Sequence, residues 1–435
     1  MSLEDIEFIR ENQNWDCKLI KEVADVYIGR TPPRKEPEWF SKDHGIKWVS
    51  IKDLGDCDLH IENTSEYLVP EAISKFNFQI APKNTILLSF KLTVGRVAIT
   101  SEEMVTNEAI AQFIIKNKSV LSNLYLYYYL KNFNYNSLGS TSSIAKAINS
   151  KMVKEIPILL PPIEIQNQIA KILYELDSKI ENLRKINHNL ISQIEAIYYS
   201  WFVYYDNYSI DELEEYEIGL KPKEWDLLSL GDVTTKIKDK VGNNTYKVFS
   251  AVNTGNLQLS EEYFDKQVFS KDIKKYIIVK QKEFAYNPAR INIGSIGRND
   301  FDFDGCVSPV YVAFKVEKGY ENFMNLFIKS SRFNQWVNTL SSGSVRQTLN
   351  YEDFSIIKIA YPPLNLVEEF NKIYNAYYEV INYNRKLIEK LENIRDLLLP
   401  KLMSGEIDVS EVNCDLKLII RKFIFKIISY LEDLI

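Results

Sequence analysis

The feature that most constrains this chain is a stretch of more than forty residues without glycine or proline, which follows Pro161-Pro162 and runs to about Tyr205. Proline is well tolerated in the first turn of a helix, because its missing N–H has no intrahelical partner there. Apolar residues recur at steps of mostly four and three, the period of a coiled-coil seam. The stretch therefore predicts one long helix over residues 161–205.

The same stretch occurs a second time, 201 positions further on and without gaps. Pro161-Pro162 aligns with Pro362-Pro363, and both copies take a four-residue step at the same place, Leu176 to Ile180 and Tyr377 to Ile381. A shared irregularity supports duplication better than shared apolarity does, and the period is domain-sized rather than solenoidal. The predicted seam comprises Ile169, Ile172, Leu176, Ile180, Leu183, Asn187, Leu190, Ile194, Phe370, Ile373, Tyr377, Ile381, Leu391 and Leu398.

Asn187 falls where an apolar residue is due on that seam. A buried Asn commonly fixes the register of paired helices, and a solvated break in the seam is the other interpretation.

The regions before the two long helices predict two α+β globular units. The first unit opens at Trp15-Asp16 and the second at Trp225-Asp226. Alternating and β-branched runs indicate strands near residues 46–51, 85–90, 94–99 and 110–115, and again near 276–279, 283–286 and 310–314. A helix is expected after each set, over 123–133 and 322–339, besides a short one over 3–12. The sequence thus predicts domains at 1–160 and 206–361, the latter starting with an acidic linker, spacer helices at 161–205 and 362–405, and a tail at 406–435.

Composition excludes several classes of protein. The four cysteines and three histidines are scattered, so a disulfide framework, a zinc ribbon and a histidine-based catalytic set are not supported. The opening residues are too acidic for a signal peptide, and no run of eighteen apolar residues exists, so a cytoplasmic protein without a membrane span is expected. The apolar tail with its basic residues fits a membrane-surface helix, but packing on protein is the preferred interpretation.

Motifs for cofactor chemistry are missing. No Gly-Lys dipeptide occurs, which excludes a P-loop, and no GxGxxG follows a strand. Asp300, Asp302 and Asp304 alternate and could hold Mg²⁺ on one face of a strand, although a solvated acidic loop is the better interpretation. No catalytic residue and no metal ligand is therefore predicted.

The chain resembles a known family, the specificity subunits of Type I restriction–modification systems. The resemblance covers nearly the whole chain. It is carried by the repeated Trp-Asp openings, by Ile156–Gln166 (IPILLPPIEIQ), by Ser200–Val203 (SWFV) and by Leu399–Ile407 (LPKLMSGEI). The second helix departs from the pattern, because its opening, Pro363–Glu369 (PLNLVEE), lacks the Glu-Gln pair that is typical there.

The resemblance implies an α+β fold with a pseudo-twofold internal repeat: two target recognition domains joined by two long antiparallel coiled-coil helices. It implies a non-catalytic subunit that reads a bipartite, asymmetric site on double-stranded DNA. The expected partners are two methyltransferase subunits and the restriction and translocase subunits, with no membrane. S-adenosylmethionine, ATP and Mg²⁺ are expected on those partners and no cofactor on this chain.

Candidate DNA contacts are basic and amide side chains in loops beside the predicted strands, since such groups can bond base edges or phosphates. They are Arg34, Lys35, Lys91, Arg96 and Asn107 in the first domain, and Arg290, Asn292, Arg298, Arg346 and Gln347 in the second. Two other hypotheses stay open. One is a coiled-coil scaffold whose units bind protein or glycan, and the other is a stand-alone nuclease or methyltransferase. The net charge of −6 argues against non-specific nucleic-acid binding but permits local basic faces.

Overall fold

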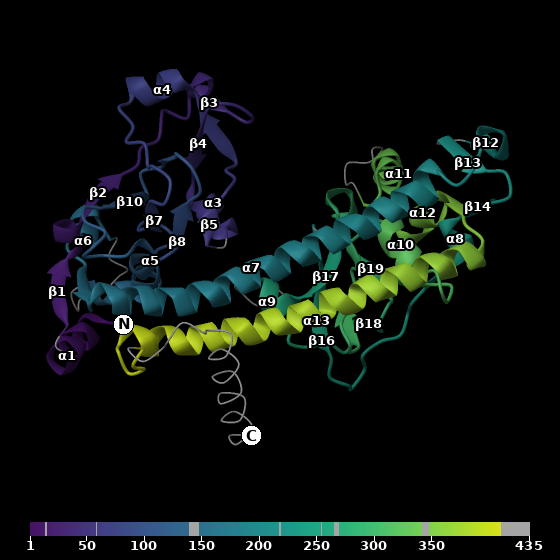
Figure 1. The fold of residues 1–435 in the computed structure, drawn as a ribbon. Helices are drawn as coiled ribbons and strands as arrows, with labels where there is room; N and C mark the ends of the chain where they lie inside the picture. The colour runs from purple at the N-terminus through teal and green to yellow at the C-terminus, as the bar shows by residue number, and fades with distance from the viewer. Residues whose placement is uncertain are drawn as a thin grey trace. The chain divides into compact units, whose positions relative to one another are not determined.

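The computed structural model describes residues 1–13, 15–57, 59–138, 148–216, 219–253, 255–264, 269–341 and 348–409. The chain divides into two compact units, shown with their element labels in Figure 1. The first unit joins Met1–Lys185 to the segment that starts at Asn384, and the second unit is Ile186–Tyr383. Each unit therefore contains a globular α+β domain and one half of each long helix. This α+β organisation around two long helices is the one predicted.

The two long helices are α7, Ile163–Tyr199, and α13, Leu364–Met403, of 37 and 40 residues. At about 1.5 Å per residue, each is roughly 55–60 Å long. Helix α7 starts directly after Pro161-Pro162, as expected, but it does not stay α-helical to residue 205. Its last turn widens into a π-helix, Ser200–Tyr204, and ends at Tyr205, whose φ of 57° is left-handed. The ring of Tyr205 packs against Trp225, with centroids 5.3 Å apart, and this packing accompanies the change.

Within each unit the two helix halves run antiparallel. In the first unit Asp177 pairs with Arg395 and Arg184 pairs with Glu392, so partners on α13 move backward as the chain advances along α7. In the second unit Ile194 belongs to the same core as Ile381, while the ring of Tyr198 lies 6.4 Å from that of Phe370, again in reverse order. The antiparallel arrangement is confirmed within each unit.

The predicted seam is mostly buried, but the apolar stripe is wider than the seam. Leu173 and Tyr374 were not predicted, yet they are 0% and 2% exposed. Each long helix packs against the globular domains as well as against the other helix. A second row of its side chains, beside the seam, is therefore buried. Of the predicted seam, the buried residues are Ile169, Leu176, Ile180, Leu183, Asn187, Ile194, Phe370, Ile381, Leu391 and Leu398, and the half-buried ones are Ile172, Leu190, Ile373 and Tyr377.

The first domain contains two sheets and a closing strand pair. Its main sheet has the order β2-β10-β7-β8-β5 and its outer sheet the order β3-β6-β4-β9, while β1 pairs with β11. Asp16 in β1 lies opposite Leu160 in β11, so the opening of the repeat meets its end. The strands are β1 Asp16–Leu19, β2 Ala24–Ile28, β3 Phe40–Ser41, β4 Ile46–Val49, β5 His60–Ile61, β6 Glu66–Leu68, β7 Ile86–Ser89, β8 Val97–Thr100, β9 Val105–Thr106, β10 Ile110–Ile115 and β11 Pro157–Leu160.

The second domain repeats this plan. Its main sheet β15-β22-β19-β20 has the order of β2-β10-β7-β8, its outer sheet is β17-β16-β21-β18, and β14 pairs with β23 as β1 does with β11. The duplication therefore extends from the helices to the sheet topology. The strands are β12 Leu213–Tyr216, β13 Gly219–Pro222, β14 Asp226–Ser229, β15 Thr234–Lys236, β16 Lys247–Val252, β17 Asn256–Leu259, β18 Ile277–Val279, β19 Phe284–Tyr286, β20 Ile296–Arg298, β21 Gly305–Val307, β22 Val312–Val316 and β23 Lys358–Tyr361.

Short helices complete each domain. Two of them, α6 and α12, are equivalent in the two copies, and each begins with an asparagine that caps its N-terminus. Asn149 accepts the N–H of Met152 at the start of α6, and Asn350 accepts that of Asp353 at the start of α12. The first unit contains α1 Leu3–Gln13, α2 Ile20–Val23, α3 Ile51–Asp56, α4 Pro70–Lys75, α5 Asn123–Asn132 and α6 Ser150–Lys154. The second contains α8 Leu230–Val233, α9 Ser260–Tyr263, α10 Glu321–Phe327, α11 Ser331–Ser341 and α12 Tyr351–Ser355.

Two expectations differ from the structure. The single helix expected over 322–339 is two helices, because the Ser330 hydroxyl accepts the N–H of Phe333 and starts α11 after α10 has ended. The acidic segment expected as a linker contains the hairpin β12–β13, in which Glu214 lies opposite Lys221. No helix in the described part of the chain is long and apolar enough to cross a membrane.

Candidate nucleic-acid interface

Arg34 is the most constrained of the basic candidates in the first domain. Its guanidinium donates to both carboxylate oxygens of Glu66, at 2.8 and 2.9 Å. The same group lies over the rings of Phe40 and Trp48, 4.3 and 4.7 Å from their centroids. Both bonds come from one nitrogen, Nη1, so Glu66 holds the guanidinium against the two rings without engaging its two-nitrogen fork, and Arg34 offers a fixed positive face. Lys35, next to it, is exposed.

The other candidates of the first domain are placed differently from one another. Arg96 is half-buried and donates from Nη1 to the carbonyl of Ile51 at 2.9 Å. Asn107 is also half-buried, and its Oδ1 accepts the N–H of Ala109 at 3.0 Å. Lys91 is exposed in the loop between β7 and β8. Lys91 is therefore the one of these three that is presented to solvent.

In the second domain, Arg298 lies in the interior. It is 5% exposed. Its guanidinium donates to the carboxylate of Asp300 at 2.6 Å and to the side-chain carbonyl oxygen of Asn322 at 2.7 Å. A further bond reaches the hydroxyl of Tyr374 on α13 at 3.1 Å. Burial disfavours the charged form, but Asp300 and the nearby tyrosines outweigh it, so the pKa of Arg298 is raised. This arginine ties the domain to its half of α13.

Arg290 is exposed and Asn292 is half-buried in the connection between β19 and β20. That connection is the counterpart of the β7–β8 loop that carries Lys91, because the two strand pairs hold the same place in the sheet order. The structure thus places four candidates from the two repeats in equivalent loops, Lys91 and Arg96 in the first and Arg290 and Asn292 in the second. Arg346 and Gln347 lie outside the described residues.

Other basic residues stacked on aromatic rings occur in both domains and were not singled out from sequence. Lys75 lies 4.2 Å from the ring centroid of Trp39 in the first unit, and Lys247 lies 5.1 Å from that of Phe303 in the second. Such stacking holds positive charge against a rigid apolar face. The available signal was the nearness of basic and aromatic residues in sequence, as in Lys75-Phe76.

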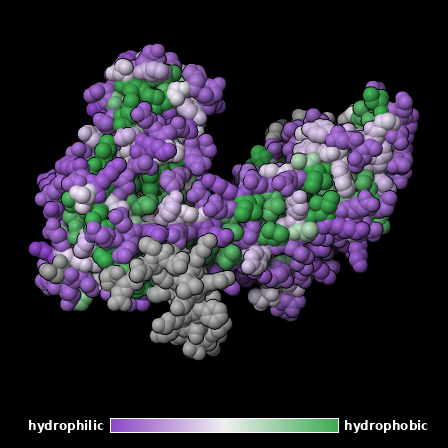
Figure 2. All heavy atoms as spheres, viewed as in Figure 1, coloured by the Kyte–Doolittle hydropathy of each residue, from purple (hydrophilic) through white to green (hydrophobic). Residues whose placement is uncertain are grey.

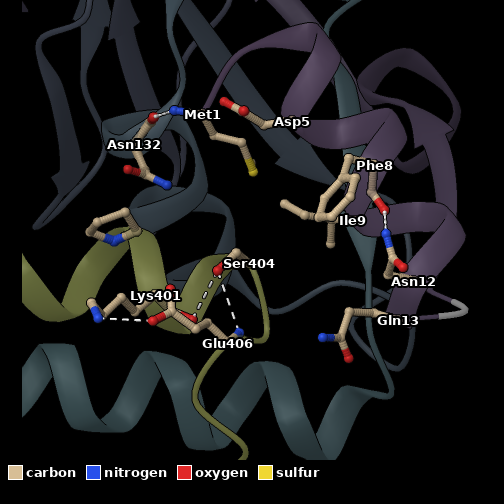
Figure 3. A pocket seen from close by; sticks show the side chains of 11 residues that line it. Met1, Asp5, Phe8, Ile9, Asn12, Gln13, Asn132, Lys401, Ser404 and Glu406 are labelled. Carbon is tan, nitrogen blue, oxygen red and sulfur yellow. Dashed lines mark hydrogen bonds and ion pairs between the residues drawn. The ribbon is translucent and has the colours of Figure 1, made fainter.

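The described residues contain no cluster of His, Cys, Asp or Glu that could hold a metal ion. Asp300 pairs with Arg298, and Asp304 accepts the N–H of Gln281, so these carboxylates are engaged within the fold. A pocket of about 650 Å³ lies between α1 and the end of α13 (Figure 3). Phe8 and Ile9 line one side of it, and on the other side Lys401 and Glu406 neutralise each other at 2.8 Å.

The chain is similar to known proteins along most of its length. Residues 12–192 match the model of the Type I restriction modification DNA specificity domain. The Type I restriction enzyme MjaIX specificity subunit of Methanocaldococcus jannaschii is 27% identical over 427 residues, which cover 92% of this chain and 95% of that protein. The putative MjaX specificity subunit of the same organism is 21% identical, covering 91% and 94%.

A solved structure supports the fold. The crystal structure of a Type I restriction–modification S subunit from M. genitalium aligns with a TM-score of 0.51 at 15% identity, covering 89% of this chain and 96% of that one. The match in fold, the matched domain and the full-length similarity to specificity subunits agree with the internal repeat described above. Together these similarities support the interpretation of this chain as a specificity subunit of the Type I restriction–modification kind.

Proposed function

We propose that this chain is the sequence-reading, non-catalytic subunit of a Type I restriction–modification complex. Each of its two domains reads one half of a split, asymmetric site on double-stranded DNA. The observation that carries the proposal is the repetition of one sheet topology in two domains whose exposed loops differ in sequence. Two readers of the same build but with different loops fit two unlike half-sites.

The long helices connect these readers. Because α7 and α13 form the antiparallel pair in both units, the number of residues along the pair limits how the two readers can be spaced. The helices also offer the docking surface for two methyltransferase subunits, and the restriction and translocase subunits join that assembly. S-adenosylmethionine, ATP and Mg²⁺ then belong to the partners.

The net negative charge of the chain is compatible with a role in DNA recognition. Phosphate contacts supply much of the affinity of proteins for DNA. With a net charge of −6, the chain depends on local basic positions such as Lys35, Lys91 and Arg290 and on charge from its partners. We therefore expect tight, selective binding only from the assembled complex. No specific observation favours the alternative of a scaffold that binds protein or glycan.

The test is methylome sequencing of cells that express this chain with the methyltransferase subunits from its own host. The expected result is one methylated motif made of two unlike half-sites at a fixed spacing. The motif should vanish when this chain is omitted and when the methyltransferase active site is inactivated. Methylation that persists without this chain would contradict the reading role, and turnover by the isolated chain with S-adenosylmethionine or Mg²⁺ would contradict the non-catalytic one.

A further inference from the structure

The loops that follow β7 and β19 are structural counterparts. Strand β7 pairs with β10 and β8, with Ile86 opposite Phe113 and Ile99. Strand β19 pairs with β22 and β20 in the same way, with Phe284 opposite Phe314 and Arg298. Each loop therefore leaves the main sheet of its domain at the same point, so any feature that both loops share was kept or regained after duplication.

Both loops present apolar side chains to water. Leu92 is 93% exposed and Val94 is 39% exposed in the first loop, and Ile293 is 58% exposed in the second. Val94 and Ile293 each stand directly before a glycine of positive φ, Gly95 at +91° and Gly294 at +83°. The turn that displays the apolar side chain is thus repeated, although the loop sequences are otherwise different.

Each of these loops also carries an exposed basic residue, Lys91 in the first and Arg290 in the second. A basic side chain can contact a phosphate group while an apolar side chain beside it contacts a base. The two side chains together therefore suit one stretch of DNA. A purely protein-facing apolar patch would not require a basic residue in both loops.

Hydrogen bonds hold the first loop in shape. The Ser89 hydroxyl donates to the carbonyl of Thr93 and accepts the N–H of Arg96, while Gly95 N–H donates to the Ser89 carbonyl at 2.9 Å. The display of Leu92 is therefore built into the turn and does not depend on a disordered tip.

The second loop is fixed by equivalent means. Asn287 N–H donates to the carbonyl of Ser295 at 3.0 Å, and Ser295 N–H donates to that of Arg290 at 3.1 Å. The Ser295 hydroxyl anchors the turn to the carbonyl of Ala251 at 2.6 Å. A preorganised loop loses little conformational freedom on binding, which favours recognition.

The backbone of Leu92 adds a separate argument. Its φ is 61°, in the left-handed region that Gly and Asn occupy readily and that a bulky apolar residue occupies rarely. Folding alone would favour Gly or Asn at this position, and solvation would favour Asn. A leucine that is both strained and exposed points to a contact made outside the folded chain.

We propose that these two loops, Lys91–Val94 and Arg290–Ile293, enter the DNA duplex and read it through apolar contact. Leu92, Val94 and Ile293 lie against base surfaces, at thymine methyl groups or at the step between two bases, and Lys91 and Arg290 bond flanking phosphates. The inference rests on the proposed function and deepens it, since it assigns one loop to each half-site.

The experiment uses the full chain assembled with its methyltransferase subunits and duplexes that carry the motif found by methylome sequencing. Leu92→Asn and Ile293→Asn are compared with the wild type by fluorescence anisotropy. Each change should weaken binding by about tenfold or more, because burial of a Leu or Ile side chain is worth at least that factor. Leu92→Asn should not lower the melting temperature, because Asn suits a φ of 61° better than Leu does.

Matched controls are exposed apolar residues elsewhere in the same units. Phe8 is 68% exposed on α1, and Val310 is 67% exposed before β22. Phe8→Asn and Val310→Asn should leave the affinity for DNA unchanged. Lys91→Ala and Arg290→Ala should each reduce the slope of log affinity against log salt by about one, as expected for the loss of one phosphate contact.

Selection from a library of randomised duplexes gives the sharpest readout. Leu92→Asn should change base preference in one half-site only, and Ile293→Asn in the other half-site only. Unchanged affinity and preference in both variants, with a wild type that binds selectively, would overturn the inference and leave the proposed function standing. Loss of co-purification with the methyltransferase subunits would show that the loops bind protein, and would also overturn it. A wild-type complex that prefers no duplex would refute the proposed function itself, and the inference with it.

Discussion

Replacing Arg395 by methionine should destabilise the first unit by about 3 kcal/mol, because the change leaves the Asp177 carboxylate buried without its strongest partner. The side chains of Asp177 and Arg395 are 8% and 16% exposed, and their Oδ1 and Nη1 atoms are 2.8 Å apart. Removal of one member of such a buried pair costs about 3–5 kcal/mol. The low end applies here, since the Tyr128 hydroxyl still donates to Asp177 at 2.9 Å and the Lys131 ammonium lies 3.9 Å away.

The assay is differential scanning calorimetry of the full chain. For a unit of roughly 200 residues, about 1 kcal/mol shifts the melting temperature by 2–4 °C, so Arg395→Met should lower it by about 6–12 °C. The matched control is Arg184→Met on the partner helix. Its bond to Glu392 is 2.6 Å long, but the two side chains are 45% and 32% exposed, and a pair this open contributes about 1 kcal/mol or less.

A second substitution separates the buried charge from the loss of packing. In the double variant Asp177→Asn with Arg395→Met, the charge is gone and the amide oxygen can still accept from Tyr128. At least half of the lost stability should return. Equal shifts for Arg395→Met and Arg184→Met, or a double variant no more stable than Arg395→Met, would refute the reasoning.

Three further predictions concern buried groups. Gln166→Val introduces the residue that the second copy has at the equivalent position, Val367. It should lower the free energy of unfolding, measured in urea, by about 2–3 kcal/mol, because the buried side chain of Gln166 accepts the N–H of Ser122 and donates to two backbone carbonyls. Glu283→Gln should raise stability at pH 7, since burial raises the pKa of Glu283 and penalises its charged form. The gain should shrink as the pH falls through the raised pKa and be gone below the ordinary value of 4.5, where the wild-type carboxyl is protonated, and thermal melts across pH would check this. Burial raises the pKa of Cys306 to about 12, so this thiol should resist iodoacetamide at pH 8 in the native protein and react in urea, as read by mass spectrometry.

The two long helices could be predicted from sequence because the signal is long and repeated, whereas their antiparallel pairing was expected from the family resemblance. Some forty residues of seam without glycine or proline leave few alternatives, and the four-residue step shared at Leu176 and Tyr377 identifies the duplication. The break between α10 and α11 was missed, because it depends on one serine: Ser330 caps a new helix with a single hydrogen bond. A feature of that size leaves no periodic signal.

The candidate interface was harder to predict, because exposure is decided by the fold. In sequence, Arg298 looks like a basic residue beside a strand, yet the structure surrounds it with Asn322 and Tyr374, 24 and 76 positions away. Leu92 looks like an ordinary core residue next to a strand, yet it is almost fully exposed. The local sequence pattern predicts the secondary structure of these segments. It does not predict exposure, because the residues that surround each side chain come from distant parts of the chain.

The differences between the two copies explain how a duplicated helix pair specifies one partner. The duplication relates Asp177 to Tyr378 and Arg395 to Ile194, so the charged pair of the first unit has an uncharged counterpart in the second. If α7 paired antiparallel with an α7 of another chain, Asp177 would face Ile194 and keep only the more distant Lys131, whose ammonium lies 3.9 Å away. If α13 paired with another α13, Arg395 would face Tyr378 and keep only Asp396, an exposed neighbour on its own helix. Each wrong pairing removes the closest buried partner of a charged group, which costs more than a lost apolar contact. The apolar seam drives association of any two of these helices, and Asp177 with Arg395 selects the intramolecular α7–α13 pair.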